Sequence, residues 1–496
     1  MLYWEHGLET LPKTFPKNKT QALSPEGRIM MKKARRLAAL GLAAVTALSM
    51  VGCGGGSTAN TTAGGGAEPA KSEAAPAAAQ AADGAGKVYF LNFKPETAEK
   101  WEEIVAEFTK ETGIPATVVT AASGTYEQTL KSEIAKTDAP TLFQINGPVG
   151  YQSWKDYCLN LKDTEFYELL SDKSLAITDG DGVYGIPYAI EGYGIITNKK
   201  IISDYCALDG AKIKDISEIN SFAKLKEVAE DIQAKKDDLG ILGAFASTSF
   251  APGEDWRWQT HLANLPLYFE YQDKGVTDAE KIDGTYLDNY KNVFDLYINN
   301  SCTAPALLSS KTVEDSMAEF ALGEVAFVQN GDWGWGQITS NNPDMSADDV
   351  TFLPIYTGVG DEAKQGVCAG TENYWCVNSK APEADQKATL QFVSWLLTTE
   401  KGKNYMVKDL GLTSPFTSFG EGEGPENPLA KSILAYAADG KIAVSWAFTT
   451  MPSQTYKNNL GAALLEYAQG TAGWDGVKSA FVDGWAAEKA NPTPEG

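Results

Sequence analysis

The stretch Phe320–Trp335, FALGEVAFVQNGDWGW, decides the fold. An apolar helical pattern leads into it, the chain turns at Gly323, and Val325–Val328 follows as a short buried strand. The strand opens into Asn330–Trp335, an amide, a carboxylate, glycines and two indoles. In open α/β sheets, ligands bind beyond the carboxyl ends of the strands. The stretch therefore predicts an α/β sheet with a binding site at this edge.

The loop after this strand combines flat apolar rings with short polar groups. Trp333 and Trp335 supply the rings, and Asp332 supplies a charged acceptor. A ligand with C–H faces and many hydroxyls, such as a sugar, suits this combination. The alternative is two core tryptophans that follow a turn.

The segment that begins near Lys87 alternates strands and helices. The predicted order is strand Val88–Phe93, a helix with inward Trp101 and Phe108, strand Ala116–Val119, helix Tyr126–Ala135 and strand Thr141–Gln144. This β-α-β-α-β order predicts a parallel sheet with helices on its faces.

Composition excludes several classes of function. The chain has 496 residues and a net charge of −23, which would repel the phosphates of nucleic acid. Only two histidines occur, His6 and His261, and His261 is expected to be packed or on the surface. No serine-hydrolase elbow, zinc-protease, P-loop or C-x-x-C motif is present. No cofactor or metal is expected.

The N-terminal region resembles a bacterial lipoprotein signal. Met30–Arg36 is basic, Leu37–Val51 is apolar but too short for a membrane span, and Gly52-Cys53 follows at once. Cys53 is the expected lipidated residue, and translation is expected to start at Met30 or Met31. Residues 54–86 are rich in Gly, Ala, Ser, Thr and Pro and are expected to form a flexible tether.

Three further segments carry carboxylates or aromatic rings. In Tyr184–Asn198, a glycine-rich apolar stretch, Glu191 either contacts ligand hydroxyls or forms a structural salt bridge. Asp255–Gln259 is a polar and aromatic cluster. One or two of Asp255, Trp256, Arg257 and Trp258 are expected to face a ligand, and the alternative for Arg257 is pairing with surface acids. Val367–Val377 is interpreted as one strand interrupted by Glu372 and Asn373.

These segments together resemble an ABC-transporter extracellular solute-binding protein of the carbohydrate-binding type, the family that includes maltose-binding protein. N-G-D-W-G-W at Asn330–Trp335 is similar to the family's N-G-x-W-x-W motif, which implies that Trp333 stacks on a sugar and that Trp335 supports it. Gly185–Glu191 resembles the first crossover between lobes, where an acidic residue reaches the sugar. After the first strand, the family's Asp-Lys pair retains only Lys94. After the third strand, Gln144 replaces an expected Trp. These two departures put maltose itself in doubt but not the carbohydrate class.

The resemblance implies a type II periplasmic-binding-protein fold, with two α/β lobes joined by crossover strands around a ligand cleft. The expected boundaries are 87–189 and 310–368 for lobe one, 193–309 and 415–490 for lobe two, and 189–193, 367–371 and 410–416 for the crossovers. The expected ligand contacts are Trp333, Glu191, Asp332, Trp256, Trp258, Arg257, Asp255, Glu372, Asn373, Lys94, Asn146, Gln144, Tyr193 and Trp335.

The expected function is a monomeric, lipid-anchored protein on the outer face of the cell membrane. It would capture a carbohydrate and deliver it to an ABC-transporter permease. The alternatives are a peptide or polyamine ligand on the same fold, or a secreted glycoside-active enzyme that uses Glu191 and Asp332 as paired carboxylates. Five cysteines remain besides Cys53, and they are expected to be reduced, buried thiols.

Overall fold

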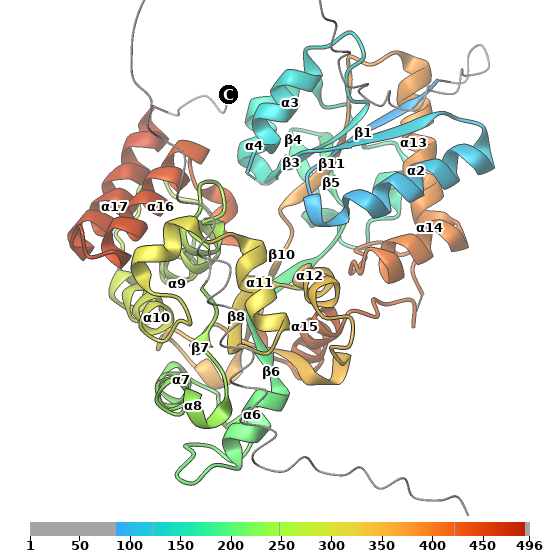
Figure 1. Cartoon of the computed structure of the whole chain (residues 1–496). Coiled ribbons are helices and arrows are strands. Elements are labelled where there is room, and N and C mark those ends of the chain that lie inside the picture. Colours follow the sequence, from blue (N-terminus) through green and yellow to red (C-terminus); the bar gives the residue numbers. More distant parts are fainter. Residues whose placement is uncertain (1–85, 123, 248, 421, 492–496) are drawn as a thin grey trace, which may run out of the picture. The chain divides into compact units, whose positions relative to one another are not determined.

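The computed structural model describes residues 86–491, except 123, 248 and 421 (Figure 1). The predicted lipoprotein signal and Cys53 lie outside the described residues. Within the part that the model describes, no helix has the length and apolar character needed to cross a membrane.

The first sheet contains all five described strands before Tyr188 and one strand from much later in the chain. Its order is β2-β1-β3-β11-β5-β4, with β1 parallel to both β2 and β3, and β11 antiparallel to β3. The strands are β1 (Val88–Asn92), β2 (Ala116–Thr120), β3 (Leu142–Asn146), β4 (Ile177–Asp179), β5 (Gly182–Pro187) and β11 (Asn373–Val377).

Helices on both faces of this sheet complete lobe one. On α2, Trp101, Ile104, Val105 and Phe108 are buried at the predicted helical spacing, and Gly113 ends the helix at φ 74°. Two apolar cores lie against the sheet. The helices are α2 (Ala98–Thr112), α3 (Tyr126–Ile134), α4 (Gly147–Trp154), α5 (Glu165–Glu168), α13 (Glu383–Thr398) and α14 (Glu400–Asn404).

The second sheet is built around β6 and β8. Its order is β12-β10-β6-β8-β7, and β9 also pairs with β6. The β7 strand is parallel to β8, whereas β6 is antiparallel to β8. The strands are β6 (Glu191–Asn198), β7 (Gly243–Phe245), β8 (Val325–Gly331), β9 (Val350–Leu353), β10 (Gln365–Gly370) and β12 (Ile442–Ser445).

The second sheet and its helices form lobe two, which holds the largest apolar core. Helices α16 and α17 pack side by side at the C-terminal end of the chain (Figure 1). The helices are α6 (Lys199–Cys206), α7 (Phe222–Ala234), α8 (Lys236–Leu239), α9 (Asn264–Lys274), α10 (Leu287–Asn299), α11 (Val313–Ala321), α12 (Gly334–Asn341), α15 (Pro428–Ala438), α16 (Gln454–Ala468) and α17 (Trp474–Ala490).

The predicted two-lobed α/β fold is confirmed, but the lobe boundaries differ from those expected. The segment 310–368 was expected in lobe one, whereas β8, β9 and β10 all belong to the second sheet. Lobe one instead takes β11, α13 and α14 from the later part of the chain. Pairing between strands more than a hundred residues apart decides this membership.

Two connections between the sheets run next to each other. The chain leaves the first sheet after β5 and enters the second at β6, where Glu191 pairs with Gly370 of β10. It returns from β10 to β11, where Tyr374 pairs with Pro187 of β5. The predicted single strand Val367–Val377 is therefore wrong. It consists of β10 and β11, which lie in different sheets.

The third passage between the lobes comes later than 410–416. Phe416 pairs with Leu170 of lobe one, and Thr413 pairs with Ile190 in the connection between β5 and β6. The segment 410–416 therefore does not yet cross into lobe two. Asn427 then donates a hydrogen bond from Nδ2 to the carbonyl of Asp332 at 2.7 Å and caps α15. The chain thus enters lobe two between Phe416 and Asn427.

Candidate ligand-binding site

The end of β8 places Trp333 at the edge of the second sheet. The strand finishes at Gly331, and α12 begins at Gly334. A Cβ atom built on Gly331 would lie 2.2 Å from atoms of the Trp333 ring, so only glycine lets the indole lie against the strand end. The local sequence thus fixes the position of the ring.

Aromatic rings from three elements meet at Trp333. Its ring centroid lies 6.1 Å from Trp256 and 5.6 Å from His261. The imidazole of His261 meets Trp256 edge-on at 4.8 Å and stacks on Tyr193 at 4.1 Å. Trp333 and Trp256 are only partly buried, whereas Tyr193 is fully buried beneath His261. The two tryptophans are therefore the rings available to a ligand.

Lys94 brings a positive charge from lobe one to the same place. Its Nζ lies 4.8 Å from the centroid of the Trp333 ring and forms an ion pair with Glu191. Glu96 lies 3.9 Å from the same Nζ atom. The Lys94 side chain is held by its loop, because the Asn92 side chain bonds both the N–H and the carbonyl of Lys94. Burial opposes the ammonium charge, but Glu191 next to it holds the pKa of Lys94 above its usual range.

Asp332 is the second carboxyl group beside Lys94. Its side chain is 3% exposed, and Oδ1 accepts a hydrogen bond from the N–H of Gly192 at 3.4 Å. Burial and the nearby charge of Glu191 raise the pKa of Asp332 to about 8, against the opposing charge of Lys94. The carboxyl is therefore mostly protonated at neutral pH and can donate as well as accept a hydrogen bond.

We call this group the Trp333 cluster. It contains Trp333, Trp256, His261, Lys94, Glu191 and Asp332. It presents two ring surfaces, a carboxylate paired with an ammonium, and a protonated carboxyl. Such a set can stack on the apolar face of a sugar and exchange hydrogen bonds with its hydroxyls.

The structure divides the predicted Asp255–Trp258 group. Trp256 belongs to the Trp333 cluster, and the Cζ atom of Arg257 lies 4.0 Å from its ring centroid. Trp258 instead stacks on Phe250 at 5.4 Å and lies in the core of lobe two. Asp255 packs against Gly461 of α16, and burial raises the pKa of Asp255 to about 6.

Other predicted residues lie around the cluster rather than in it. Gln144 is buried and accepts a hydrogen bond from the N–H of Phe93 at 2.7 Å, which positions the loop that carries Lys94. Asn373 begins β11 and pairs with Asn146 of β3. Trp335 packs against the core that contains α11 and α12.

A small cavity of about 20 Å³ lies between the two lobes near Asn146. Glu372, Thr449 and Lys457 also line it. Burial raises the pKa of Glu372, and Lys457 opposes this shift. Asn146 and Glu372 therefore lie together at this cavity, which Trp333 does not line.

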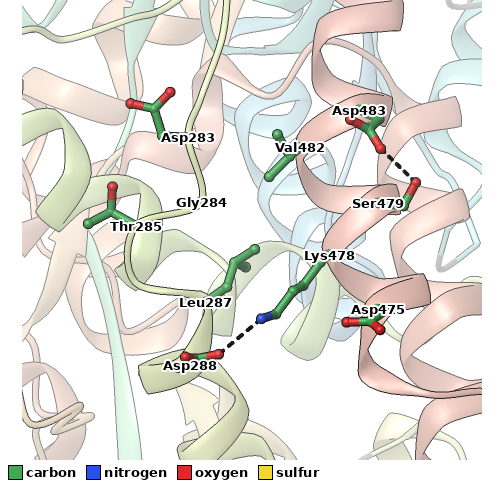
Figure 2. A pocket seen from close by; sticks show the side chains of 10 residues that line it. All are labelled: Asp283, Gly284, Thr285, Leu287, Asp288, Asp475, Lys478, Ser479, Val482 and Asp483. Carbon is green, nitrogen blue, oxygen red and sulfur yellow. Dashed lines mark hydrogen bonds and ion pairs between the residues drawn. The ribbon is translucent and has the colours of Figure 1, made fainter.

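A larger cavity, of about 440 Å³, lies between the start of α10 and α17 (Figure 2). Its side chains include four aspartates, and Lys478 pairs with Asp288 at 3.3 Å. No aromatic ring lines it, so it lacks the surface that a sugar needs for stacking. Nowhere in residues 86–491, as far as they are described, do three or more His, Cys, Asp or Glu side chains form a possible metal site.

Sequence reasoning missed three residues near the site. His261 joins Trp256 because Arg257–Leu262 forms a π-helix, whose i→i+5 bonding shifts the residues that share a face. Glu96 follows Lys94 by two residues and has no motif of its own. Trp446 lies 5.7 Å from Tyr193 and comes from the distant C-terminal part of the chain. Of the three, only His261 lies next to a marked segment, the aromatic and polar run Trp256–His261.

Comparisons with known proteins agree with this architecture. The family model described as "Bacterial extracellular solute-binding protein" matches residues 103–432, which is more than half of the chain. None of the curated proteins compared with the chain matches it.

Several solved structures share the fold at low sequence identity. RafE, solved in complex with raffinose, has a TM-score of 0.63 and 16% identity, covering 81% of this chain and 99% of that one. A chitin oligosaccharide binding protein has a TM-score of 0.64 and 17% identity, covering 82% and 99%. The GacH receptor of Streptomyces glaucescens, solved unliganded and with acarbose, has a TM-score of 0.62 and 16% identity, covering 82% and 100%. The extent of the family match shows that this chain belongs to the bacterial extracellular solute-binding proteins.

Proposed function

We propose that this protein binds a carbohydrate at the Trp333 cluster. The observation that carries the proposal is the pair of partly buried tryptophans, 6.1 Å apart, beside Lys94, Glu191 and Asp332. Rings and charged hydrogen-bonding groups in one place match the two kinds of surface on a sugar. The named ligands of similar structures, raffinose and acarbose, support the same class of ligand.

The proposal includes anchoring and delivery. The pattern from Met30 to Cys53 supports a lipid on Cys53, and membership of an extracellular family supports a position on the outer side of the membrane. A tethered protein of this kind would pass its ligand to an ABC-transporter permease. The ligand would be released unchanged.

A screen of mono- and oligosaccharides by thermal shift tests the proposal. A specific sugar raises the melting temperature as its concentration increases, because it binds only the folded state. Trp333→Ala should weaken binding of that sugar by about 1–3 kcal/mol, the scale of a buried aromatic contact in a binding site. The matched control is Trp335→Ala, which removes a neighbouring ring of α12 that packs against the core containing α11 and α12.

Two results would contradict the proposal. One is the absence of a concentration-dependent shift with any sugar. The other is equal loss of affinity in Trp333→Ala and Trp335→Ala, which would mean that the loop rather than the ring matters. Circular dichroism of both variants checks that the fold is retained.

A free amine is a poorer ligand for this site than a sugar. The ammonium of Lys94 already lies over the Trp333 ring and against Glu191, so the protein itself fills the position that a polyamine would take. Polyamines added to the same thermal-shift screen distinguish the two classes of ligand, because only a sugar is expected to raise the melting temperature.

Catalysis would need Glu191 and Asp332 to act on a glycosidic bond. The ion pair with Lys94 occupies Glu191. Incubation with oligosaccharides should produce no new reducing ends, and their appearance, lost in Glu191→Gln, would instead indicate a glycoside-active enzyme.

A further inference from the structure

Arg257 is a buried cation without a partner. Its side chain is 0% exposed, and Nε, Nη1 and Nη2 have no hydrogen-bond partner among the residues that the structure describes. The backbone is fixed at the start of the π-helix, where the side chain of Gln329 donates to the carbonyl of Arg257 at 2.9 Å. The fold thus fixes the backbone of Arg257, while the hydrogen-bonding capacity of its guanidinium is unused.

An unpaired guanidinium in this environment is unfavourable. Buried charges in proteins are normally paired and hydrogen-bonded, because their removal from water is costly. Burial lowers the pKa of Arg257 to about 9, so the group still carries its charge at neutral pH. The Trp256 ring provides a cation–π contact at 4.0 Å but accepts none of the five N–H bonds.

Arg257 lies next to the Trp333 cluster. The ring that it contacts, Trp256, is 6.1 Å from Trp333. Its charge also acts on Glu96 of lobe one and contributes, after burial, to the lowered pKa of His261. The group is therefore within electrostatic reach of residues from both lobes.

The two cations at this site differ in their partners. Lys94 is neutralised by Glu191 and Glu96, whereas the charges of Glu254 and Glu96 act on Arg257 without either carboxylate forming an ion pair within 4 Å among the described residues. A guanidinium offers a planar fork of donors that matches a carboxylate. The unused donors are therefore suited to an anionic group that arrives with the ligand.

We propose that the ligand is an oligosaccharide that carries a carboxylate, such as a uronic acid residue, and that Arg257 pairs with this carboxylate. This inference rests on the proposed carbohydrate-binding function. Trp256 covers the guanidinium, so the carboxylate reaches it when the Trp256 side chain turns or when the lobes separate. Asp332, protonated at neutral pH, adds little repulsion.

The test compares oligouronates with their own carboxyl-reduced forms. Calorimetry on the purified full-length protein would use galacturonate, mannuronate and glucuronate oligosaccharides, each beside the same chain with its carboxylates converted to alcohols. We expect at least one acidic member to bind about ten- to hundred-fold more tightly than its reduced form, the scale of a charged hydrogen bond. Arg257→Gln should remove this difference between the acidic and the reduced form.

A second variant separates recognition from folding. Arg257→Met keeps most of the side-chain volume without the charge, so the ligand-free protein should melt at the same or a higher temperature. A large fall in melting temperature would mean that Arg257 has structural partners, and the inference would fail.

The outcomes distinguish this inference from the proposed function. If neutral or carboxyl-reduced sugars bind as tightly as acidic ones, the protein binds carbohydrate but Arg257 does not select a carboxylate. Tighter binding of a sugar phosphate than of any uronate would overturn the carboxylate assignment. If no sugar of any kind binds, the proposed function itself is wrong.

Discussion

Asp332→Asn tests the electrostatics of the site without a ligand. The substitution keeps the shape of the side chain and removes its titration. The pKa of Asp332 rises from an ordinary 3.8 to about 8 in the folded protein, so folding favours the protonated form. The wild-type protein therefore loses stability as the pH rises from about 4 to about 8, whereas the asparagine variant has no such loss at this position.

The size of the effect follows from the shift in pKa. Each pH unit between the two pKa values costs the wild-type protein about 1.4 kcal/mol of unfolding free energy. At pH 7 the accumulated cost is about 4 kcal/mol relative to pH below 4, and it levels off above pH 8. Between pH 4 and pH 7 the unfolding free energy of the variant should therefore rise by about 4 kcal/mol relative to that of the wild-type protein, because asparagine does not ionise.

Urea unfolding of both proteins at several pH values between 4 and 8 measures the difference. The comparison cancels other titrating groups that both proteins share. Glu191→Gln in the wild-type background provides the matched control. Without the charge of Glu191, the pKa of Asp332 falls, so the loss of stability should begin at the same pH and end at a lower one.

One result would refute the reasoning. If the stability difference between Asp332→Asn and the wild-type protein is constant between pH 4 and 8, Asp332 ionises normally. The carboxyl would then be solvated or paired, and its proposed role as a donor to ligand hydroxyls would be wrong.

Two further predictions concern the anchor and the lobes. Mass spectrometry of protein extracted from the membranes of its own cell should show a lipid-modified Cys53 at the N-terminus, and an intact N-terminus upstream of Cys53 would contradict the anchor. Addition of the correct sugar should lower the radius of gyration in X-ray scattering, because a ligand that touches both lobes favours the closed form. A tight ligand that leaves the radius unchanged would indicate a preformed pocket.

Local patterns predicted the elements better than their assembly. The helix with Trp101 and Phe108 and the strand Val325–Val328 follow from spacing and burial. The break within Val367–Val377 could not be seen, because both halves are buried strands and only their partners differ. The predicted assignment of 310–368 to lobe one was wrong for the same reason, because the pairing of β8 with the distant strand β6 places this segment in lobe two.

The site shows a similar division. A motif marks Trp333 and an isolated carboxylate in an apolar stretch marks Glu191, and both residues contact Lys94 in the structure. Trp258 carried the same aromatic signal as Trp256, yet the π-helix directs it into the core. Trp446 reaches Tyr193 through tertiary packing, which leaves no mark in the sequence near either residue.

The two adjacent connections between the sheets restrict how the lobes can move. Since β6 pairs with β10 at Glu191 and Gly370, and β5 pairs with β11 at Pro187 and Tyr374, they form a two-stranded ribbon. A ribbon bends most easily out of its own plane, which leaves one dominant axis of rotation. Glu191 begins β6 within this ribbon, while Lys94 belongs to lobe one and Trp333 to lobe two. A bend of the ribbon would therefore change the separation of Lys94 and the Trp333 ring, which now lie 4.8 Å apart.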